Sequence, residues 1–207
     1  MTSVSIIVPT YKRIDQTVKT LKLIFASRGW GMEFTAEVVV ADSTPDKSLE
    51  KVLLENFGTE VIYTKPERAG IATNKNQGAK MAKYPILVFC DSDMEVEPDT
   101  LINTINSLQK HPTTGAIGGQ VIWKGGGKDG ELDRPRPEDR IKTLDGVSYI
   151  EALYSRFLVT YKSVFWEVGG YDERVFNMRG EGSDLSIRYW RAGFPLVYDV
   201  ALKVHHV

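Results

Sequence analysis

The stretch ILVFCDSDMEVEPD, residues 86–99, places five consecutive apolar residues directly before two carboxylates, Asp91 and Asp93. A short apolar run of this kind is typical of a strand that is buried on both faces. An acidic side chain at the end of such a strand loses hydration, which is costly unless a partner compensates its charge. A divalent cation, Mn²⁺ or Mg²⁺, would be such a partner, because it prefers oxygen ligands and would offset the repulsion between the two aspartates.

Two other interpretations of the acidic pair remain open at this point. Asp93 or Asp99 could cap the helix predicted after Pro98, since aspartate is a preferred N-cap residue and proline is favoured in the first helical turn. Asp91 could instead be the nucleophile of a phosphatase of the haloacid-dehalogenase type. That group usually carries its motif after the first strand, whereas this pair follows the fourth, so we rank the phosphatase lower.

Strands and helices alternate along the first part of the chain. This alternation predicts an α/β domain with a mostly parallel central sheet and helices on both faces. Ligands of such sheets bind beyond the carboxyl ends of the strands, so the loops that begin at Pro9, Asp42, Lys65 and Asp91 should line one crevice. The expected strands are residues 4–8, 37–41, 61–64, 86–90 and 116–122, and the expected helices are residues 14–29, 49–57, 71–83 and 101–108.

The regular alternation stops at Trp123. Residues 124–140 are rich in glycine, proline and charge and have no apolar period, which predicts a long loop. A tolerated surface insertion and a lid over a binding site are both open for it. The rest of the chain predicts a helix near 147–154, a strand near 157–161, a helix at 184–192 and a final apolar segment that ends in two histidines, His205 and His206.

Composition excludes several classes of protein. The 207 residues are 42% hydrophobic, enough for one well-packed domain. A net charge of −1 gives no nucleic-acid footprint, and the single cysteine, Cys90, allows no internal disulfide. The first residues are too quickly polar for a signal peptide, and no stretch of 18 apolar residues is present to span a membrane. We expect a cytoplasmic protein that can still dock on a membrane surface; its oligomeric state cannot be read from the sequence.

Seven separated motifs, in order, resemble glycosyltransferase family 2, whose members have the GT-A fold. The resemblance implies metal-dependent transfer of a sugar, with inversion, from a nucleotide diphosphate (a UDP-sugar first, a GDP-sugar second) to a saccharide, lipid-carrier or small-molecule acceptor. It also implies a nucleotide-sugar-binding half at residues 1–122, a flexible loop at 123–145 and an acceptor half at 146–207. The motifs are VSIIVPTYKR, VVVADST, GIATNKNQGAKMA, LVFCDSDMEVEPDTL, VGGYDERVF, GEGSDLSIRYWRAG and VHH.

The resemblance also implies roles for individual residues. Asp93 would be the main metal ligand, Asp91 would bind the ribose or support the ion, and His205 matches the family's terminal histidine better than His206 does. Ordinary alternatives are a turn acid for Asp42, solvated charges for Arg68 and Lys75 and a structural role for each histidine. The implied donor-binding residues are Pro9, Thr10, Tyr11, Arg13, Asp42, Arg68, Lys75, Asn76, Asp91 and Ser92.

The family's catalytic base is expected at the start of the late helix, and there the sequence departs from the pattern. Related enzymes usually carry Glu-Asp-x-Asp, whereas this chain has Glu181, Gly182, Ser183 and Asp184, so glycine replaces the usual base. We expect Glu181 to act as base and Asp184 to support it, although Asp184 could simply cap the helix. A chain without any base would be a nucleotide-sugar-binding module with little or no turnover.

The acceptor side is the least determined part of the predicted site. The resemblance makes an acceptor wall of Trp166, Gly170, Tyr171 and Asp172, while the two aromatic residues could equally be part of the core. An NAD-type dehydrogenase is disfavoured, because no G-x-G-x-x-G follows the first strand.

Overall fold

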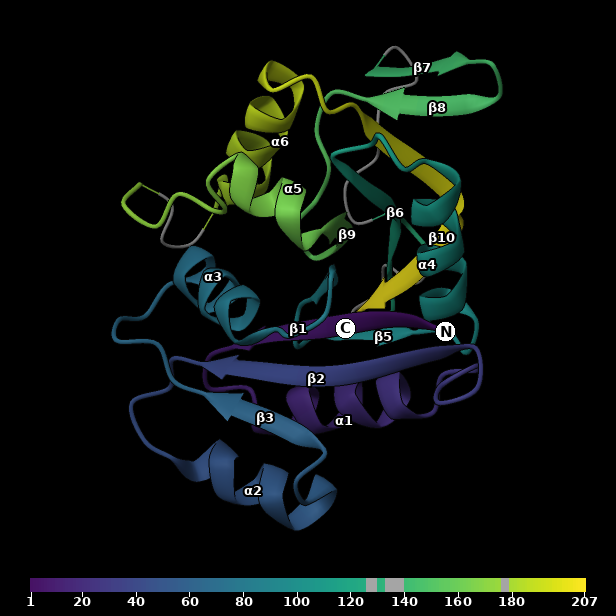
Figure 1. Ribbon diagram of the computed structural model, residues 1–207. Helices are drawn as coiled ribbons and strands as arrows, with labels where there is room; N and C mark the ends of the chain where they lie inside the picture. The colour runs from purple at the N-terminus through teal and green to yellow at the C-terminus, as the bar shows by residue number, and fades with distance from the viewer. Residues whose placement is uncertain (126–129, 133–139, 176–178) are drawn as a thin grey trace.

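The computed structural model describes residues 1–125, 130–132, 140–175 and 179–207, and within them the strands form one sheet in the order β3-β2-β1-β4-β9-β6-β10-β8-β7, with β5 paired to β10 (Figure 1). The α/β class predicted from the sequence is confirmed. Strands β3, β2, β1 and β4 run parallel, as predicted. β9 is antiparallel to both of its neighbours, β4 and β6, so the second half of the sheet is mixed.

The first half follows the predicted alternation closely. Strand β4 has the predicted bounds, and α3 ends two residues earlier than expected. The elements are β1 (Thr2–Thr10), α1 (Ile14–Phe25), β2 (Phe34–Asp42), α2 (Ser48–Phe57), β3 (Val61–Thr64), α3 (Ile71–Met81), β4 (Ile86–Cys90), β5 (Met94–Val96), α4 (Thr100–Lys110) and β6 (Ala116–Trp123).

The second half contains one clear error of the sequence prediction. The segment expected to be a helix near 147–154 is a strand followed by a loop, because its alternating β-branched and aromatic residues pair with β7 in a hairpin. β7 also shortens the predicted 123–145 loop, most of whose remainder lies outside the described residues. The elements are β7 (Ile141–Leu144), β8 (Val147–Ile150), β9 (Phe157–Tyr161), α5 (Lys162–Glu167), α6 (Glu181–Arg191) and β10 (Leu196–His206).

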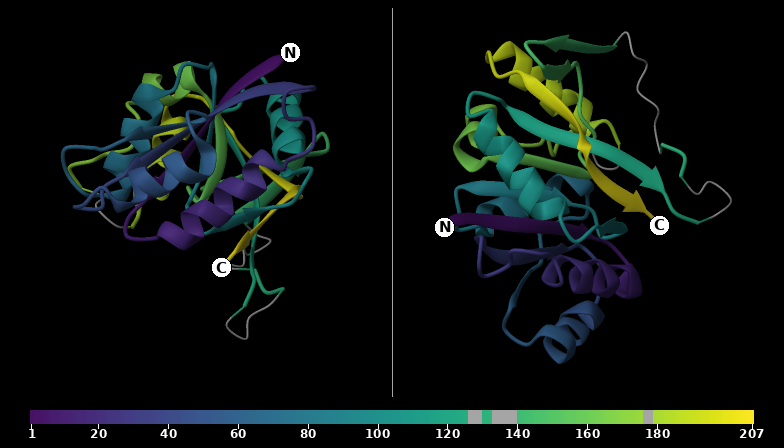
Figure 2. Two further views of the ribbon diagram at one scale, coloured as in Figure 1. Left: turned by 90° about the horizontal axis from the view of Figure 1, so that it is seen from below. Right: turned by 90° about the vertical axis from the view of Figure 1, so that its right-hand side faces the viewer.

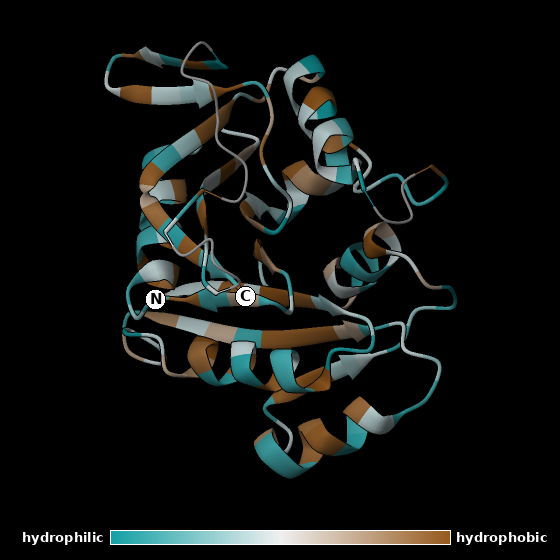
Figure 3. Ribbon diagram, turned by 180° about the vertical axis from the view of Figure 1, so that it is seen from behind, coloured by the Kyte–Doolittle hydropathy of each residue, from teal (hydrophilic) through white to brown (hydrophobic). Residues whose placement is uncertain are grey.

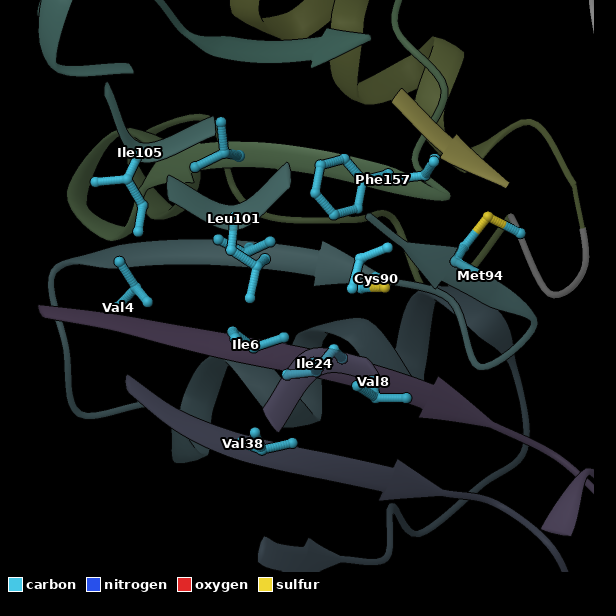
Figure 4. Close-up of a cluster of buried hydrophobic side chains, with 14 of the residues drawn as sticks. Val4, Ile6, Val8, Ile24, Val38, Cys90, Met94, Leu101, Ile105 and Phe157 are labelled. Atoms are coloured by element: carbon cyan, nitrogen blue, oxygen red, sulfur yellow. The ribbon is translucent and has the colours of Figure 1, made fainter. Parts of the chain in front are cut away.

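Alternate residues of the central strands pack into two cores on opposite faces of the sheet. Val4, Ile6 and Val8 of β1 face the core that contains residues of α1 and α4, part of which is drawn in Figure 4. Ile7 faces the other core, with residues of α3, α5 and α6. In Figure 3 the central strands are largely hydrophobic, while the helices alternate hydrophobic and hydrophilic residues, as amphipathic helices on a buried sheet should.

The end of the chain returns to the middle of the sheet. β10 runs parallel to β6, and Figure 2 shows the two strands side by side in its right-hand view. The last residues of β10 also pair antiparallel with β5, directly after the acidic loop that follows β4. This pairing brings residues more than a hundred positions apart in the sequence to the carboxyl end of β4.

Candidate active site

A cavity of about 680 Å³ opens at the carboxyl ends of β1 and β4. Its walls include the loops after β1, β2 and β4, as the rule for parallel sheets predicts. The loop after β3 lines the cavity through Ala69 and Gly70, whereas Lys65 at its start does not, because its ammonium is hydrogen-bonded to the backbone carbonyls of residues 44–46. Residues 153–156 and 179–183 close the cavity from the second half of the chain.

The acidic loop after β4 is held in place by its backbone. The N–H of Asp91 donates a hydrogen bond to the carbonyl of Arg156 at 2.8 Å. The hydroxyl of Thr20, on α1, lies 2.9 Å from the carbonyl oxygen of Ser92 and 2.8 Å from that of Met94. Three residues predicted at the site, Asp91, Ser92 and Asp93, therefore reach the cavity on a fixed loop.

His206 completes this wall of the cavity. Strand pairing puts His206 opposite Met94, and the imidazole Nε2 lies 3.4 Å from Asp93 Oδ2. His205 points to the other side of the strand, where it contacts Glu97 at 3.0 Å. The expectation that His205 completes the metal site is therefore wrong in geometry, and His206 is the histidine beside the acidic pair.

The Asp93–His206 pair fits a divalent cation in both chemistry and spacing. Carboxylate oxygen suits Mg²⁺ and Mn²⁺, and imidazole is a frequent ligand of transition metals. Two ligands at right angles, each about 2.1 Å from an ion, lie about 3 Å apart, close to the 3.4 Å between Asp93 Oδ2 and His206 Nε2. Within the described part of the chain, no cluster of three or more His, Cys, Asp or Glu side chains could hold a metal, so a bound ion would take further ligands from substrate or water.

The two aspartates differ in their electrostatics. Burial raises the pKa of Asp91 to about 6, with Lys75 opposing and Asp93 adding to the rise. Burial also disfavours the charged form of Asp93, but contacts with His206 and the ion pair with Arg13 outweigh it and lower its pKa. Asp93 is thus the carboxylate prepared to carry a negative charge, as expected of the main metal ligand.

Lys75 is buried behind the cavity wall and links the two halves of the site. Its ammonium lies 3.1 Å from Asp91 Oδ1 and 3.5 Å from Glu181 Oε1, and it donates to the Ser155 carbonyl at 2.7 Å. The side chain has no exposed surface. Lys75 therefore does not reach a diphosphate directly, contrary to the prediction, because its charge is committed to two carboxylates.

Glu181 begins α6 and lines the cavity. The chain enters this helix through Gly180 in the left-handed region, at φ 93°, which glycine adopts without strain. Burial opposes ionisation of Glu181, but the charge of Lys75 and a hydrogen bond from the Ser155 hydroxyl outweigh it and lower its pKa. Glu181 is ionised at neutral pH, as a general base must be.

The second predicted catalytic acid, Asp184, is placed elsewhere. Its carboxylate accepts hydrogen bonds from Arg188 Nε at 2.9 Å and Nη2 at 2.6 Å, one turn along α6. It does not line the cavity, and its side chain does not cap the helix. The structure therefore removes Asp184 from the candidate catalytic residues, because its charge is paired with Arg188 away from the cavity.

The end of β1 and the loop after it line the cavity as predicted, through Pro9, Thr10, Tyr11 and Arg13. Asp42, after β2, does not. Its side chain is fully buried, and its carboxylate accepts hydrogen bonds from the backbone of residue 44 and from a tyrosine of β3. The turn-acid interpretation of Asp42 is the one that the structure supports.

Arg68 and Asn76, predicted near the diphosphate, also lie outside the cavity wall. The Arg68 guanidinium donates to the carbonyl of Glu173 at 2.7 Å. The Asn76 amide donates to the carbonyl of Tyr171 and to the Glu173 carboxylate, and it accepts from the Tyr171 N–H. Arg68, in the loop before α3, and Asn76, on α3, both contact the segment after α5 rather than the cavity.

The predicted acceptor wall is wrong in geometry. Tyr171 is buried and packs edge-on against Phe89 and Phe165, and Trp166 also packs edge-on against Phe165. Gly170 lies under that tryptophan, where an added Cβ would come within 2.8 Å of its ring. Asp172 caps a turn through the N–H of a neighbouring arginine. These residues form core and turn, because the aromatic side chains gain more by packing in the interior.

Several residues of the cavity were missed by sequence reasoning. Ser155 and Arg156 lie just before β9, whose register pairs Cys90 with Phe157 and so brings them beside the acidic loop. Asn74 donates from its amide to the carbonyl of Thr10 and the hydroxyl of Ser43, which ties two cavity loops together. Ser155 and Arg156 precede an apolar strand, but no local pattern tells that this strand pairs with the one that ends at the acidic loop.

The fold is that of GT-A glycosyltransferases, as comparison with solved structures shows. Over the whole chain it resembles GalNAc-T7 with UDP, GalNAc and Mn²⁺, with a TM-score of 0.80 and 20% identity. Over 98% of the chain it resembles the mannosyltransferase PcManGT from Pyrobaculum calidifontis in complex with GDP-Man and Mn²⁺, with a TM-score of 0.72 and 17% identity. The chain spans 44% and 56% of those structures.

The family follows from the sequence comparison. The family model described as Glycosyl transferase family 2 matches residues 5–169, so the chain belongs to that family. The chain is 23% identical to the glucosyl-dolichyl phosphate glucuronosyltransferase of Haloferax volcanii, over 98% of this chain and 68% of that protein. It is also 23% identical to the putative polypeptide N-acetylgalactosaminyltransferase 10 of Drosophila melanogaster, but spans only 31% of it. In the described residues, no helix is long and apolar enough to cross a bilayer.

Proposed function

We propose that the chain transfers a sugar from a nucleotide diphosphate to an acceptor hydroxyl, with inversion, and that it requires a divalent cation. The observation that carries this proposal is that one cavity holds both the Asp93–His206 pair and the ionised Glu181. The Asp93–His206 pair suits the departing diphosphate and its cation, and Glu181 suits the attacking hydroxyl. The family membership supports the same assignment.

The residues have separate tasks in this reaction. Asp93 and His206 would hold the divalent cation, which would supply positive charge beside the departing diphosphate. Arg13 lines the same cavity and, once displaced from Asp93, adds its guanidinium near that anion. Glu181 takes the proton of the acceptor hydroxyl. At the same time the hydroxyl oxygen of the acceptor bonds to the anomeric carbon, and the bond from that carbon to the diphosphate breaks. Attack from the side opposite the leaving group inverts that carbon.

The donor and acceptor are proposed only by class. Structural neighbours hold UDP or GDP-Man, so UDP- and GDP-sugars are the donors to test first. The name of the archaeal relative specifies a lipid-linked saccharide acceptor, which keeps lipid carriers and saccharides as the leading acceptor classes. The free, buried Cys90 fits a reducing compartment such as the cytoplasm.

The donor test needs no acceptor. Purified protein is incubated with UDP-, GDP- and dTDP-sugars, with Mn²⁺ or EDTA, and release of nucleoside diphosphate is measured. We expect Mn²⁺-dependent release from one donor class, lost in Asp93→Asn and strongly reduced in His206→Ala. His205→Ala is the matched control, since that side chain faces away from the cavity. Release in EDTA equal to that in Mn²⁺ would contradict the metal-dependent mechanism.

Glu181→Gln separates catalysis from binding. The amide keeps the size of the side chain but cannot take a proton, so we expect donor affinity, measured by calorimetry, to stay within about twofold while turnover falls by roughly 10²–10⁴-fold. Unchanged turnover would exclude Glu181 as base. A wild-type protein that binds a donor but neither transfers nor hydrolyses it would instead be a nucleotide-sugar-binding module.

A further inference from the structure

Glu181 is held by a hydrogen-bond chain that runs through Ser155. The Lys75 ammonium donates to the Ser155 hydroxyl at 3.0 Å, and the Ser155 hydroxyl donates to Glu181 Oε1. A serine hydroxyl has a single proton. Because the Ser155 oxygen already accepts from an ammonium group, its proton is directed to the carboxylate. Both hydrogen bonds therefore point in the same direction, from Lys75 through Ser155 to Glu181.

Ser155 reaches this position through the sheet. Cys90 pairs with Phe157 in the antiparallel β4–β9 ladder, and the Asp91 N–H binds the carbonyl of Arg156 just beyond the ladder's end. Ser155 is the next residue outward and is buried there. Its carbonyl accepts a second hydrogen bond from Lys75 at 2.7 Å, so backbone and side chain are both fixed.

The glycine that replaces the usual base lies directly against Ser155. An ideal Cβ built on Gly182 would stand 3.1 Å from both Ser155 Cβ and its backbone nitrogen, and 3.2 Å from its hydroxyl. Contacts this short are tighter than most Cβ contacts, so Ser155 would have to shift by a few tenths of an ångström. A side chain at position 182 would therefore displace Ser155 from its present position.

We propose that Ser155 is a positioning residue for Glu181, and that Ser155 and Gly182 act as a coupled pair that replaces the aspartate usual at position 182. Ser155 and Lys75 hold Oε1, which leaves Oε2 as the oxygen that takes the acceptor proton. This proposal deepens the proposed function and rests on it for its kinetic part. Its structural part, the coupling of Ser155 to Glu181 and to position 182, can be tested without any substrate.

Several groups face the Glu181 carboxylate. The ammonium of Lys75 comes from α3, Asp91 comes from the loop after β4, and the buried Tyr171 lies with its ring 5.5 Å from the Lys75 ammonium. Ser155→Ala leaves the side chain of each of these groups in place, although Lys75 loses its hydrogen bond to the Ser155 hydroxyl. A shift in the titration of Glu181 in that variant therefore reports the loss of the hydroxyl.

The first experiment measures donor hydrolysis by Ser155→Ala. We expect kcat to fall about tenfold or more, KM for the donor to change little, and the acidic limb of the kcat–pH profile to move up by about one to two pH units, the strength of a hydrogen bond to a charged group. Ser5→Ala is the matched control, since Ser5 is buried and donates to Glu37 Oε1 at 2.5 Å outside the cavity wall. An acidic limb that stays in place would overturn the positioning role.

The second experiment does not depend on activity. Protein labelled with ¹³C at glutamate side-chain carboxyl carbons is titrated by NMR, and Glu181→Gln identifies the Glu181 signal. We expect the Glu181 midpoint to rise in Ser155→Ala and to stay unchanged in Ser5→Ala; equal midpoints in wild type and Ser155→Ala would overturn the proposal. A wild type that releases no diphosphate from any donor while its midpoint responds to Ser155 would contradict the proposed function instead.

The coupling to position 182 is tested by restoring the usual acid. We expect Gly182→Asp to lower donor hydrolysis and thermal stability, because the new side chain pushes Ser155 away from Glu181. Adding Ser155→Gly should recover part of that stability by removing the Cβ and hydroxyl contacts. Stability of Gly182→Asp equal to wild type, with the Glu181 midpoint unchanged, would show that the two positions are independent.

Discussion

A single buried ammonium, Lys75, compensates two acidic groups that belong to opposite sides of the site, Asp91 and Glu181. A buried charge with two counter-charges and two further hydrogen bonds is well satisfied. The same arrangement makes the site dependent on one side chain. Loss of the ammonium would leave two carboxylates in a poorly hydrated place, and that cost is measurable.

Lys75→Met should therefore strongly destabilise the protein. We expect a loss of about 3–5 kcal/mol in the free energy of unfolding, measured with urea at pH 7, because breaking a buried pair leaves uncompensated charge. Lys83→Met is the matched control. Its exposed ammonium lies 3.8 Å from Glu37, so we expect a change below about 1 kcal/mol. Equal effects of the two substitutions would show that burial of Lys75 adds nothing.

Asp91 should make stability depend on pH in an unusual direction. Its pKa is raised to about 6 by burial, above the value of about 3.9 in an unfolded chain. Folding therefore favours the protonated form of Asp91. The resulting contribution to the free energy of unfolding is fully present below about pH 4 and is lost as pH rises through 6. In metal-free buffer, the stability of Asp91→Asn relative to wild type should increase between pH 4 and pH 7 in thermal unfolding.

Asp46→Asn is the contrasting control for that experiment. The side-chain and backbone hydrogen bonds of Ser48 lower the pKa of the exposed Asp46, so its contribution is present above the unfolded pKa and is lost as pH falls. Its stability relative to wild type should vary in the opposite direction, and only at acidic pH. A stability difference between Asp91→Asn and wild type that does not change with pH would contradict the raised pKa of Asp91.

At this scale the sequence predicts residue types better than partners. Asp91 and Asp93 were found because an apolar run ends on them, and that signal is local. The choice between His205 and His206 depended on which residue of β10 faces the cavity, which only the pairing with β5 determines. Lys75 was recognised as a functional charge, but its burial behind the cavity depends on the register of β9, which no local pattern reveals.

At the scale of elements, the packing of α3 on β1 depends on one glycine. Gly78 lies in the helix interior, where alanine would normally be about 1 kcal/mol better. Here an added Cβ would stand 2.4 Å from Ile7 Cγ2, in the core between helix and sheet. The small residues Ala72 and Ala79 of the same helix are buried in that core as well.

Gly78→Ala should consequently destabilise the protein despite its better helix propensity. We expect a net loss of about 1–3 kcal/mol in urea unfolding, because overpacking outweighs the propensity gain. Lys80→Ala, an exposed change on the same helix, should stay within about 0.5 kcal/mol. A stabilised Gly78→Ala would mean that α3 can shift away from β1 at no cost.

Elements were predictable where their pattern was strong and local. The parallel strands β1 to β4 are apolar and were placed within a few residues of their true bounds. Strand β8 was mistaken for part of a helix near 147–154, and β7 for part of a loop, because a four-residue strand carries too few alternations to oppose a weak helical period. The pairing of β7 with β8 decides the outcome, and pairing is a property of two segments rather than one.

At the scale of the whole molecule, the cavity lies between two halves of the chain and is lined by residues from both. Loops after β1, β2, β3 and β4 form one part of its wall, and residues 153–156, residues 179–183 and His206 form the other. A ligand that fills the cavity must contact both parts. The family relatives named above are longer than this chain, which spans 68% of one and 31% of the other.

Binding of UDP or GDP with Mn²⁺ should therefore slow hydrogen exchange in both halves at once. We expect protection of the peptides that contain Asp91–Asp93 and of those covering 153–156, because opening of either wall releases the ligand. At about 100 times Kd the slowing can reach about 100-fold where exchange requires ligand release. Helix α2, outside the cavity, is the internal control and should not change. Protection confined to the acidic loop would mean that the second half of the chain does not contact the bound nucleotide, and that Glu181 cannot act on the bound donor.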